Sequence, residues 1–254
     1  MCEQRSGIHP RKRTRPGLPG LFIRVVITGE LKGEDVRIEA VIFDLDGLMV
    51  DSEPLARQAW RTLLASYGHE LDEETVNAML GLRLMDSSRL VKGRFALPLT
   101  VEQIANRRGE LLLASLPGNL QPMPGLIELL NAIDARGLRR AVATSSPGFY
   151  APVALQEIGA ADGFVVIVTG DSVARGKPAP DIYLAAAAAL ALPPTLCLAL
   201  EDSPNGVRSA KAAGMRCIAV PNELSVELDL SEADAILPSL GAVAQRLDEF
   251  LVEP

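Results

Sequence analysis

The chain has 254 residues, enough for one domain with an insertion, and 48% of them are hydrophobic while 22% are charged, as is usual in a soluble globular protein. The net charge of −7 argues against nucleic-acid binding, which needs a basic surface, and no apolar run approaches the ~20 residues of a membrane helix. The three cysteines form no CxxC pair and no zinc spacing, which fits a reducing compartment. We therefore expect a cytoplasmic protein without a membrane or nucleic-acid partner.

The first 37 residues differ in composition from the rest. Residues 1–16 carry five basic side chains against one acidic side chain, and this stretch is rich in Pro and Gly without hydrophobic periodicity. Such a composition cannot bury enough apolar surface to fold, so we predict a disordered extension over residues 1–37. A basic arm that binds nucleic acid or an acidic membrane is the alternative interpretation.

From residue 39 onward, short apolar runs alternate with longer helical segments. The predicted strands are Ala40–Phe43, Arg140–Ala143, Phe164–Val168, Leu196–Leu200 and Arg216–Val220. The predicted helices are Pro124–Arg136, Phe149–Ile158, Asp181–Leu192 and Gly206–Ala213. Fully apolar strands that alternate with helices indicate an α/β fold with buried parallel strands.

One connection is much longer than the others. Nearly a hundred residues separate the first two predicted strands, far more than a crossover helix requires. Helical spacing of apolar residues covers most of this interval, at Ala56–Tyr67, Glu73–Leu80, Met85–Phe95 and Val101–Leu113. We therefore expect a helical cap domain at residues 53–120, inserted into a core domain formed by residues 38–52 and 121–254.

Polar side chains follow the first four predicted strands. They are Asp44, Asp46, Asp51 and Ser52 after the first strand, Thr144, Ser145 and Ser146 after the second, Asp171 and Lys177 after the third, and Glu201 and Asp202 after the fourth. Each group alone has an ordinary explanation as a turn, a helix cap or a solvated loop residue. Because the site of an open parallel sheet forms at the carboxyl ends of its strands, their joint occurrence predicts one site.

These residue types suit phosphate chemistry. Asp44 and Asp46 flank a single residue, so in extended backbone both side chains point the same way. With Glu201 and Asp202 they would form a dense negative cluster that needs a cation, and Mg²⁺ prefers such oxygen ligands. A phosphate that approaches this cluster needs donors, which Lys177 and backbone N–H groups can supply.

The ordered set of motifs resembles that of the haloacid dehalogenase superfamily. The segments that carry the resemblance are Phe43–Ser52, Ala143–Ser146, Gly176–Asp181 and Leu200–Gly206. The resemblance covers about residues 38–240. Within the superfamily, the chain is similar to the small-cap branch, which contains β-phosphoglucomutase, 2-deoxyglucose-6-phosphatase and pseudouridine-5′-phosphatase. It implies a Rossmann-like parallel sheet of order 3-2-1-4-5 with helices on both faces and an inserted α-helical cap.

The resemblance also implies an activity. The chain would be a magnesium-dependent phosphatase, a phosphoric monoester hydrolase that acts on small phosphorylated metabolites such as sugar phosphates. Asp44 would be the nucleophile that forms an aspartyl-phosphate, and Asp46 would be the general acid–base. We expect such an enzyme to be a monomer.

Further residues take roles by the same resemblance. Mg²⁺ would be bound by the Asp44 carboxylate, the Asp46 backbone carbonyl and Asp202, with Glu201 in or near the outer shell. The residues expected to hold the phosphoryl group are Thr144, Ser145 and Lys177. The residues expected to contact the rest of the substrate are Glu53, Arg83 and Ser146.

Two alternative functions stay open at this point. A phosphosugar mutase of the β-phosphoglucomutase type would have a histidine at the place of Ala56 and an arginine at the place of Leu84, so both departures favour hydrolysis. True dehalogenases lack the second aspartate, whereas Asp46 is present. A catalytically weak phospho-ligand-binding protein with a basic recruiting arm is the alternative from another class.

Overall fold

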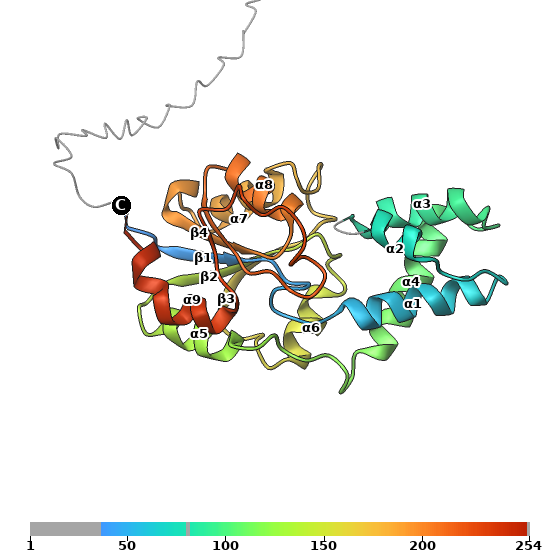
Figure 1. Cartoon of the computed structure of the whole chain (residues 1–254), viewed down its shortest axis with the longest axis horizontal. Coiled ribbons are helices and arrows are strands. Elements are labelled where there is room, and N and C mark those ends of the chain that lie inside the picture. The colour runs from blue at the N-terminus through green and yellow to red at the C-terminus, as the bar shows by residue number, and fades with distance from the viewer. Residues whose placement is uncertain (1–36, 80–81, 253–254) are drawn as a thin grey trace, which may run out of the picture. The chain divides into compact units, whose positions relative to one another are not determined.

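A parallel sheet of six strands lies at the centre of the fold (Figure 1). The computed structural model describes residues 37–79 and 82–252. The strands are β1 (Ala40–Phe43), β2 (Arg139–Ala143), β3 (Phe164–Val168), β4 (Cys197–Glu201), β5 (Arg216–Ala219) and β6 (Ala235–Ile236). Their order is β3-β2-β1-β4-β5-β6, so the predicted order of the first five strands is confirmed. The predicted extension over residues 1–37 lies outside the described residues, apart from Arg37.

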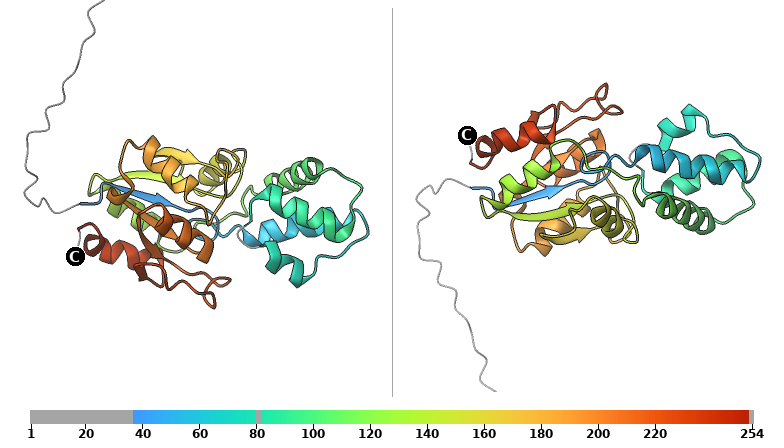
Figure 2. Two further views of the ribbon diagram at one scale, coloured as in Figure 1. Left: turned by 90° about the horizontal axis from the view of Figure 1, so that it is seen from above. Right: turned by 90° about the horizontal axis from the view of Figure 1, so that it is seen from below.

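Alternate residues of β1, β2, β4 and β5 face two different hydrophobic layers. Val41 and Phe43 of β1 pack on α5 (Leu126–Asp134), α6 (Ala151–Glu157) and α9 (Leu240–Arg246). Ala40 and Ile42 face the opposite layer, which contains α7 (Asp181–Ala189) and α8 (Pro204–Ala212). The helices on both faces are visible in Figures 1 and 2. This arrangement confirms the expected α/β fold, with its central strands buried on both faces.

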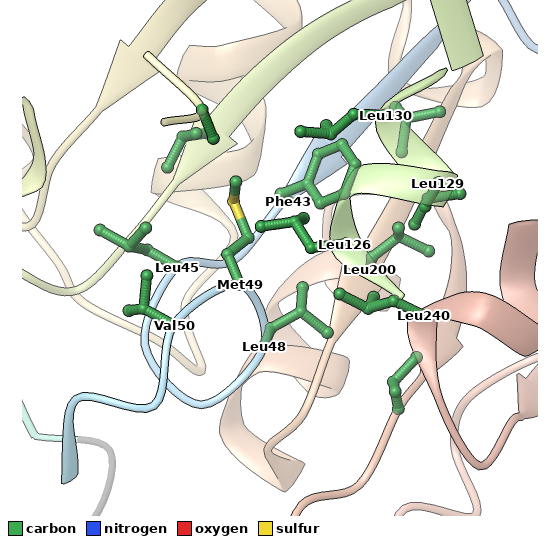
Figure 3. Packing of buried hydrophobic residues seen from close by; sticks show 14 of the residues in the cluster. Phe43, Leu45, Leu48, Met49, Val50, Leu126, Leu129, Leu130, Leu200 and Leu240 are labelled. Atoms are coloured by element: carbon green, nitrogen blue, oxygen red, sulfur yellow. The ribbon is translucent and has the colours of Figure 1, made fainter. Parts of the chain in front are cut away.

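The loop after β1 is anchored by its own apolar side chains. Leu45, Leu48, Met49 and Val50 are all buried in the same cluster as Phe43 (Figure 3). The apolar residue between the two aspartates therefore points into the core. Since side chains alternate along extended backbone, the aspartates on either side of it are directed away from the core.

Four helices lie between β1 and β2: α1 (Glu53–Ala65), α2 (Glu73–Met79), α3 (Leu84–Phe95) and α4 (Val101–Ser115). They enclose a separate hydrophobic cluster that includes Trp60, Leu64, Val91 and Ile104. A capping box joins the Thr100 and Gln103 side chains to the backbone at the start of α4. Each of the four helices overlaps one of the four predicted in this interval.

The structure contains several short elements that the sequence did not predict. They are β6, α9 and the short 3₁₀ helices η1 (Pro194–Leu196) and η2 (Leu247–Phe250). The strand has two residues and α9 has seven, which is too short for a clear periodic pattern. Within residues 37–79 and 82–252, no helix has both the length and the apolar character that a bilayer crossing demands. Cytoplasmic location stays a prediction.

Candidate active site

A cleft of about 1530 Å³ opens at the carboxyl ends of the strands and is lined also by the inserted helices. Eight of the predicted site residues line it, namely Asp44, Asp46, Glu53, Thr144, Ser145, Ser146, Lys177 and Asp202. Glu201 lies beneath the cleft and is fully buried. The structure thus brings together side chains from four strand ends, as the position of the motifs predicts.

Lys177 is held between two carboxylates. Its Nζ donates hydrogen bonds to Asp44 Oδ1 at 2.8 Å and to Glu201 Oε1 at 2.5 Å. Burial acts to lower the pKa of this lysine, but the charges of Asp44 and Glu201 outweigh it and raise the pKa overall. Lys177 therefore stays a cation at the base of the cleft and can attract an anion there.

The Glu201 carboxylate is saturated with donors. Its Oε1 accepts from Lys177 and from the Tyr183 hydroxyl at 2.8 Å, and its Oε2 accepts from the backbone N–H groups of Asp202 and Ser203. A side chain at Gly206 would collide with this carboxylate, so the glycine is needed for the close approach. Glu201 thus fixes Lys177 and the start of α8 and is directed away from the open cleft.

Three acidic groups form a cluster that suits a divalent cation. Asp44, Glu201 and Asp202 each offer a carboxylate oxygen, and these atoms lie within 4.8 Å of one another. Burial is the largest cause that raises the pKa of Asp44 to about 7, against the opposing charge of Lys177. Burial and the neighbouring Glu201 likewise raise the pKa of Asp202 well above its ordinary value. A cation with oxygen ligands would relieve this repulsion, so the donor set fits Mg²⁺.

Asn222, in the loop after β5, fixes the orientation of Asp202. Its Nδ2 donates to Asp202 Oδ2 at 2.8 Å and to the Gly47 carbonyl at 3.1 Å. Its own Oδ1 accepts from the backbone N–H groups of Leu224 and Ser225, which locks the amide in one orientation. The loops after β1, β4 and β5 are therefore joined at the acidic cluster.

Three hydroxyl groups surround the Asp46 carboxylate. Oδ1 accepts from Ser52 Oγ at 2.5 Å and from Tyr150 Oη at 2.8 Å, and Oδ2 accepts from Ser146 Oγ at 2.6 Å. Burial is the largest cause that raises the pKa of the Tyr150 hydroxyl, followed by the charge of Asp46. Tyr150 therefore stays protonated and acts as a donor to Asp46. The three bonds set the side chain of Asp46 apart from the Asp44–Lys177 pair.

The second motif shapes the wall next to Asp46. The Thr144 hydroxyl is buried and accepts from the backbone N–H of Ser146 at 3.0 Å. The Gly170 backbone lies directly against the Ser145 carbonyl, where a side chain would not fit. Thr144 and Ser145 thus belong to a rigid turn that lines the cleft beside Lys177.

The two expected contacts from the inserted helices lie in different places. Glu53, at the start of α1, lines the cleft and has Arg57 at 3.8 Å. Arg83 is not part of the cleft lining; it bonds to Asp86 at 3.0 Å and to the Ala174 carbonyl at 3.3 Å. Arg83 therefore joins the inserted helices to the loop before Lys177, and its contact with substrate stays a prediction.

Several residues of the site were not identified from the sequence: Arg108, Tyr150, Tyr183 and Asn222. For Asn222 there was a signal, because it follows β5 in the same way that the motif residues follow the other strands. Tyr183 and Tyr150 gave no signal, since each belongs to a helix region and bonds to a carboxylate far away along the chain.

The sequence of this chain matches a known enzyme family. A model described as haloacid dehalogenase-like hydrolase matches residues 38–214. The chain belongs to this family. The expected enzyme class, a phosphoric monoester hydrolase, is confirmed by the family match and by relatives that are named phosphatases.

Relatives and solved structures of this haloacid dehalogenase-like hydrolase cover most of the chain. Protein CbbY of Rhodobacter capsulatus is 35% identical over 82% of this chain and 96% of its own length. The phosphorylated carbohydrates phosphatase of Thermotoga maritima is 32% identical over 78% of this chain and 93% of its own. The crystal structure of a CbbY mutant from Rhodobacter sphaeroides with xylulose-(1,5)bisphosphate is 32% identical, with a TM-score of 0.75, and covers 81% of this chain and 96% of that one.

Proposed function

We propose that this hydrolase cleaves phosphate monoesters of small metabolites, chiefly sugar phosphates, through a phosphorylated Asp44 and with Mg²⁺ as its cofactor. The buried Asp44 carboxylate carries the proposal, because it stands at the end of β1 with Lys177 on one side and Asp202 within the same acidic cluster. A nucleophilic carboxylate needs a neighbouring cation that holds the phosphoryl oxygens, and Lys177 meets this need.

The residues of the cleft can perform both halves of the reaction. Lys177 Nζ, the Thr144 hydroxyl and the Ser145 N–H orient the phosphoryl group while an Asp44 oxygen attacks phosphorus and the ester P–O bond breaks. Asp46 donates a proton to the leaving alkoxide, then takes a proton from the water that hydrolyses the aspartyl-phosphate. Inorganic phosphate leaves and the Asp44 carboxylate is restored.

Mg²⁺ would be held by Asp44 and Asp202, together with the Asp46 backbone carbonyl. When bound, Mg²⁺ supplies positive charge that offsets the carboxylates and the charge on the phosphoryl oxygens. Glu201 already accepts from Lys177, Tyr183 and backbone N–H groups, so it supports the metal site from the outer shell. The inserted helices α1–α4 would act as the cap that excludes water from the cleft.

Hydrolysis is supported over phosphoryl transfer between sugars by the cap side of the cleft. Ala56 and Leu84, the positions that carry a histidine and an arginine in β-phosphoglucomutase, both line the cleft with apolar side chains. The test is phosphate release from a panel of sugar phosphates with and without Mg²⁺. Isomerised sugar phosphates without phosphate release would indicate a mutase, and no turnover of any ester would indicate a phospho-ligand-binding protein.

The metal gives a first prediction. An Asp202→Ala variant should bind Mg²⁺ more weakly than wild type. The loss of affinity should exceed the roughly 10–100-fold that is typical when a residue of the outer shell is changed. Because burial raises the pKa of Asp44 to about 7, a proton competes with the metal, and binding should weaken as the pH falls below about 7. Calorimetric titration with Mg²⁺ checks both effects, with Asp51→Ala as the matched control. If the folded Asp202→Ala variant binds Mg²⁺ as tightly as wild type, Asp202 is not a ligand of the metal.

Asn222 gives a second prediction. An Asn222→Ala variant keeps every carboxylate but frees Asp202 and loses the bond to the Gly47 carbonyl. Outer-shell partners of metal ligands are worth roughly 10–100-fold in affinity, so Mg²⁺ should bind more weakly by this factor. Asn205→Ala is the control, since the Asn205 side chain lines the cleft and, among the residues that the structure describes, bonds only to Arg208. Equal Mg²⁺ affinity in the two variants would show that Asn222 does not orient the metal ligand.

A further inference from the structure

Arg108 lies in the cleft without a hydrogen-bond acceptor among the described residues. It belongs to α4, and its Nε is excluded from water yet has no partner. Its guanidinium lies over the Trp60 ring, 5.6 Å from the ring centre. The preceding residue, Arg107, differs, because it bonds to the Tyr67 hydroxyl. A half-buried guanidinium without acceptors is costly, and a ligand that supplies acceptors would offset this cost.

The acidic groups near Arg108 are already engaged by other residues. The pKa of Arg108 is lowered by burial, and the charges of Asp46 and Glu53 oppose this effect. Asp46 accepts hydrogen bonds from three hydroxyl groups, and Glu53 has Arg57 beside it at 3.8 Å. None of these groups forms an ion pair with Arg108 in residues 37–79 and 82–252.

A second arginine lies on the same wall. Arg61 of α1 lines the cleft with Arg108, and it has no ion pair within the described parts of the chain. Helices α1 and α4 pack against each other, and both arginines line the cleft. Arg57, one turn before Arg61, is instead paired with Glu73 at 3.1 Å. Among the described residues that line the cleft, Lys177 is a cation at its base, and Arg61 and Arg108 are cations without an acidic partner.

We propose that Arg108 binds a second anionic group, a phosphate or a carboxylate, on the leaving group of the substrate. The preferred substrates would then be phosphate esters whose alcohol carries its own negative charge. The planar guanidinium presents several donors that match the oxygens of such an anion in pairs, which a neutral sugar hydroxyl cannot do. This inference rests on the proposed phosphatase activity and names its substrate class.

Two pairs of substrates test the proposal. Fructose 1,6-bisphosphate is compared with fructose 1-phosphate, and 3-phosphoglycerate with glycerol 3-phosphate, so that each pair differs in one added anion. Hydrogen bonds to charged groups contribute about 1.5–3 kcal/mol, so the wild-type kcat/KM should favour the charged member by roughly 10–100-fold. A larger preference for the charged member in the fructose pair would indicate a second phosphate, and a larger preference in the glycerate pair would indicate a carboxylate.

The variants then assign this selectivity to one side chain. In Arg108→Gln the ratio of kcat/KM between the charged and neutral members should fall close to one, whereas in the matched control Arg107→Gln it should equal that of wild type. If Arg108→Gln does not fold, Arg108→Met, which keeps apolar contact with Trp60, takes its place. A wild-type ratio near one for both pairs, or an unchanged ratio in the Arg108 variant, would overturn the proposal. Absence of phosphate release from every substrate by the wild type would instead refute the proposed function.

Discussion

An Asp44→Asn variant should fold normally and lose hydrolysis by many thousand-fold, on the order of 5 kcal/mol or more of transition-state stabilisation. The amide does not attack phosphorus and is a poor ligand for Mg²⁺, while its oxygen can still accept the hydrogen bond from Lys177. Phosphate release measured on an active sugar phosphate gives the loss. Asp51→Asn is the control, since Asp51 is an exposed carboxylate of the same cleft and should keep activity.

The thermal stability of the Asp44→Asn variant should show that its loss of activity comes from the missing nucleophile and not from unfolding. Because burial raises the pKa of Asp44 to about 7, the folded protein holds a proton that the unfolded chain releases at lower pH. Stability from this group is therefore present below the unfolded pKa and is lost as the pH rises toward 7. Without Mg²⁺, at about pH 8, Asp44→Asn should melt no lower than wild type in thermal denaturation. A well-folded variant that keeps about a tenth of the activity would contradict the nucleophile, since that loss is only about 1.4 kcal/mol.

The sheet was predictable because its strands are short, apolar and separated by helices with clear boundaries. The predicted strands β1 and β3 match the structure residue for residue, β2 and β5 differ from it by one residue at one end, and β4 is shifted by one residue. Helix α5 starts later than predicted because Gly125 adopts a positive φ of 86° as the N-cap, so Pro124 lies outside the helix. Element β6 was missed because its two residues pair with β5 through tertiary structure alone.

The residues of the site that follow strand ends were predictable, and its tyrosines were not. Asp44, Lys177 and Asp202 follow strand ends, so the parallel topology alone brings them to one rim. The hydrogen bond from Tyr150 to Asp46 joins residues 104 positions apart and depends on how α6 begins beneath the cleft. No local pattern in the sequence encodes such a contact, nor the isolation of Arg108 on α4.

The Asp46→Asn variant should separate the two halves of the proposed reaction. General acid–base catalysis contributes roughly 10²–10⁴-fold, and a sugar alkoxide leaves poorly without a proton. The first step, release of the alcohol and phosphorylation of Asp44, should therefore be slowed strongly with a sugar phosphate. With 4-nitrophenyl phosphate the leaving group is stable as an anion, so the burst of nitrophenolate should survive while the second step fails.

Single-turnover measurements of alcohol release and of phosphate release check this, with Tyr150→Phe as the matched comparison. Tyr150→Phe removes one of three donors to Asp46 but leaves the carboxylate, so both substrates should be affected alike and less severely. Equal slowing of the first step for both substrates in Asp46→Asn would rule out Asp46 as the general acid. The difference between the two leaving groups is decisive because only proton donation depends on how basic the departing oxygen is.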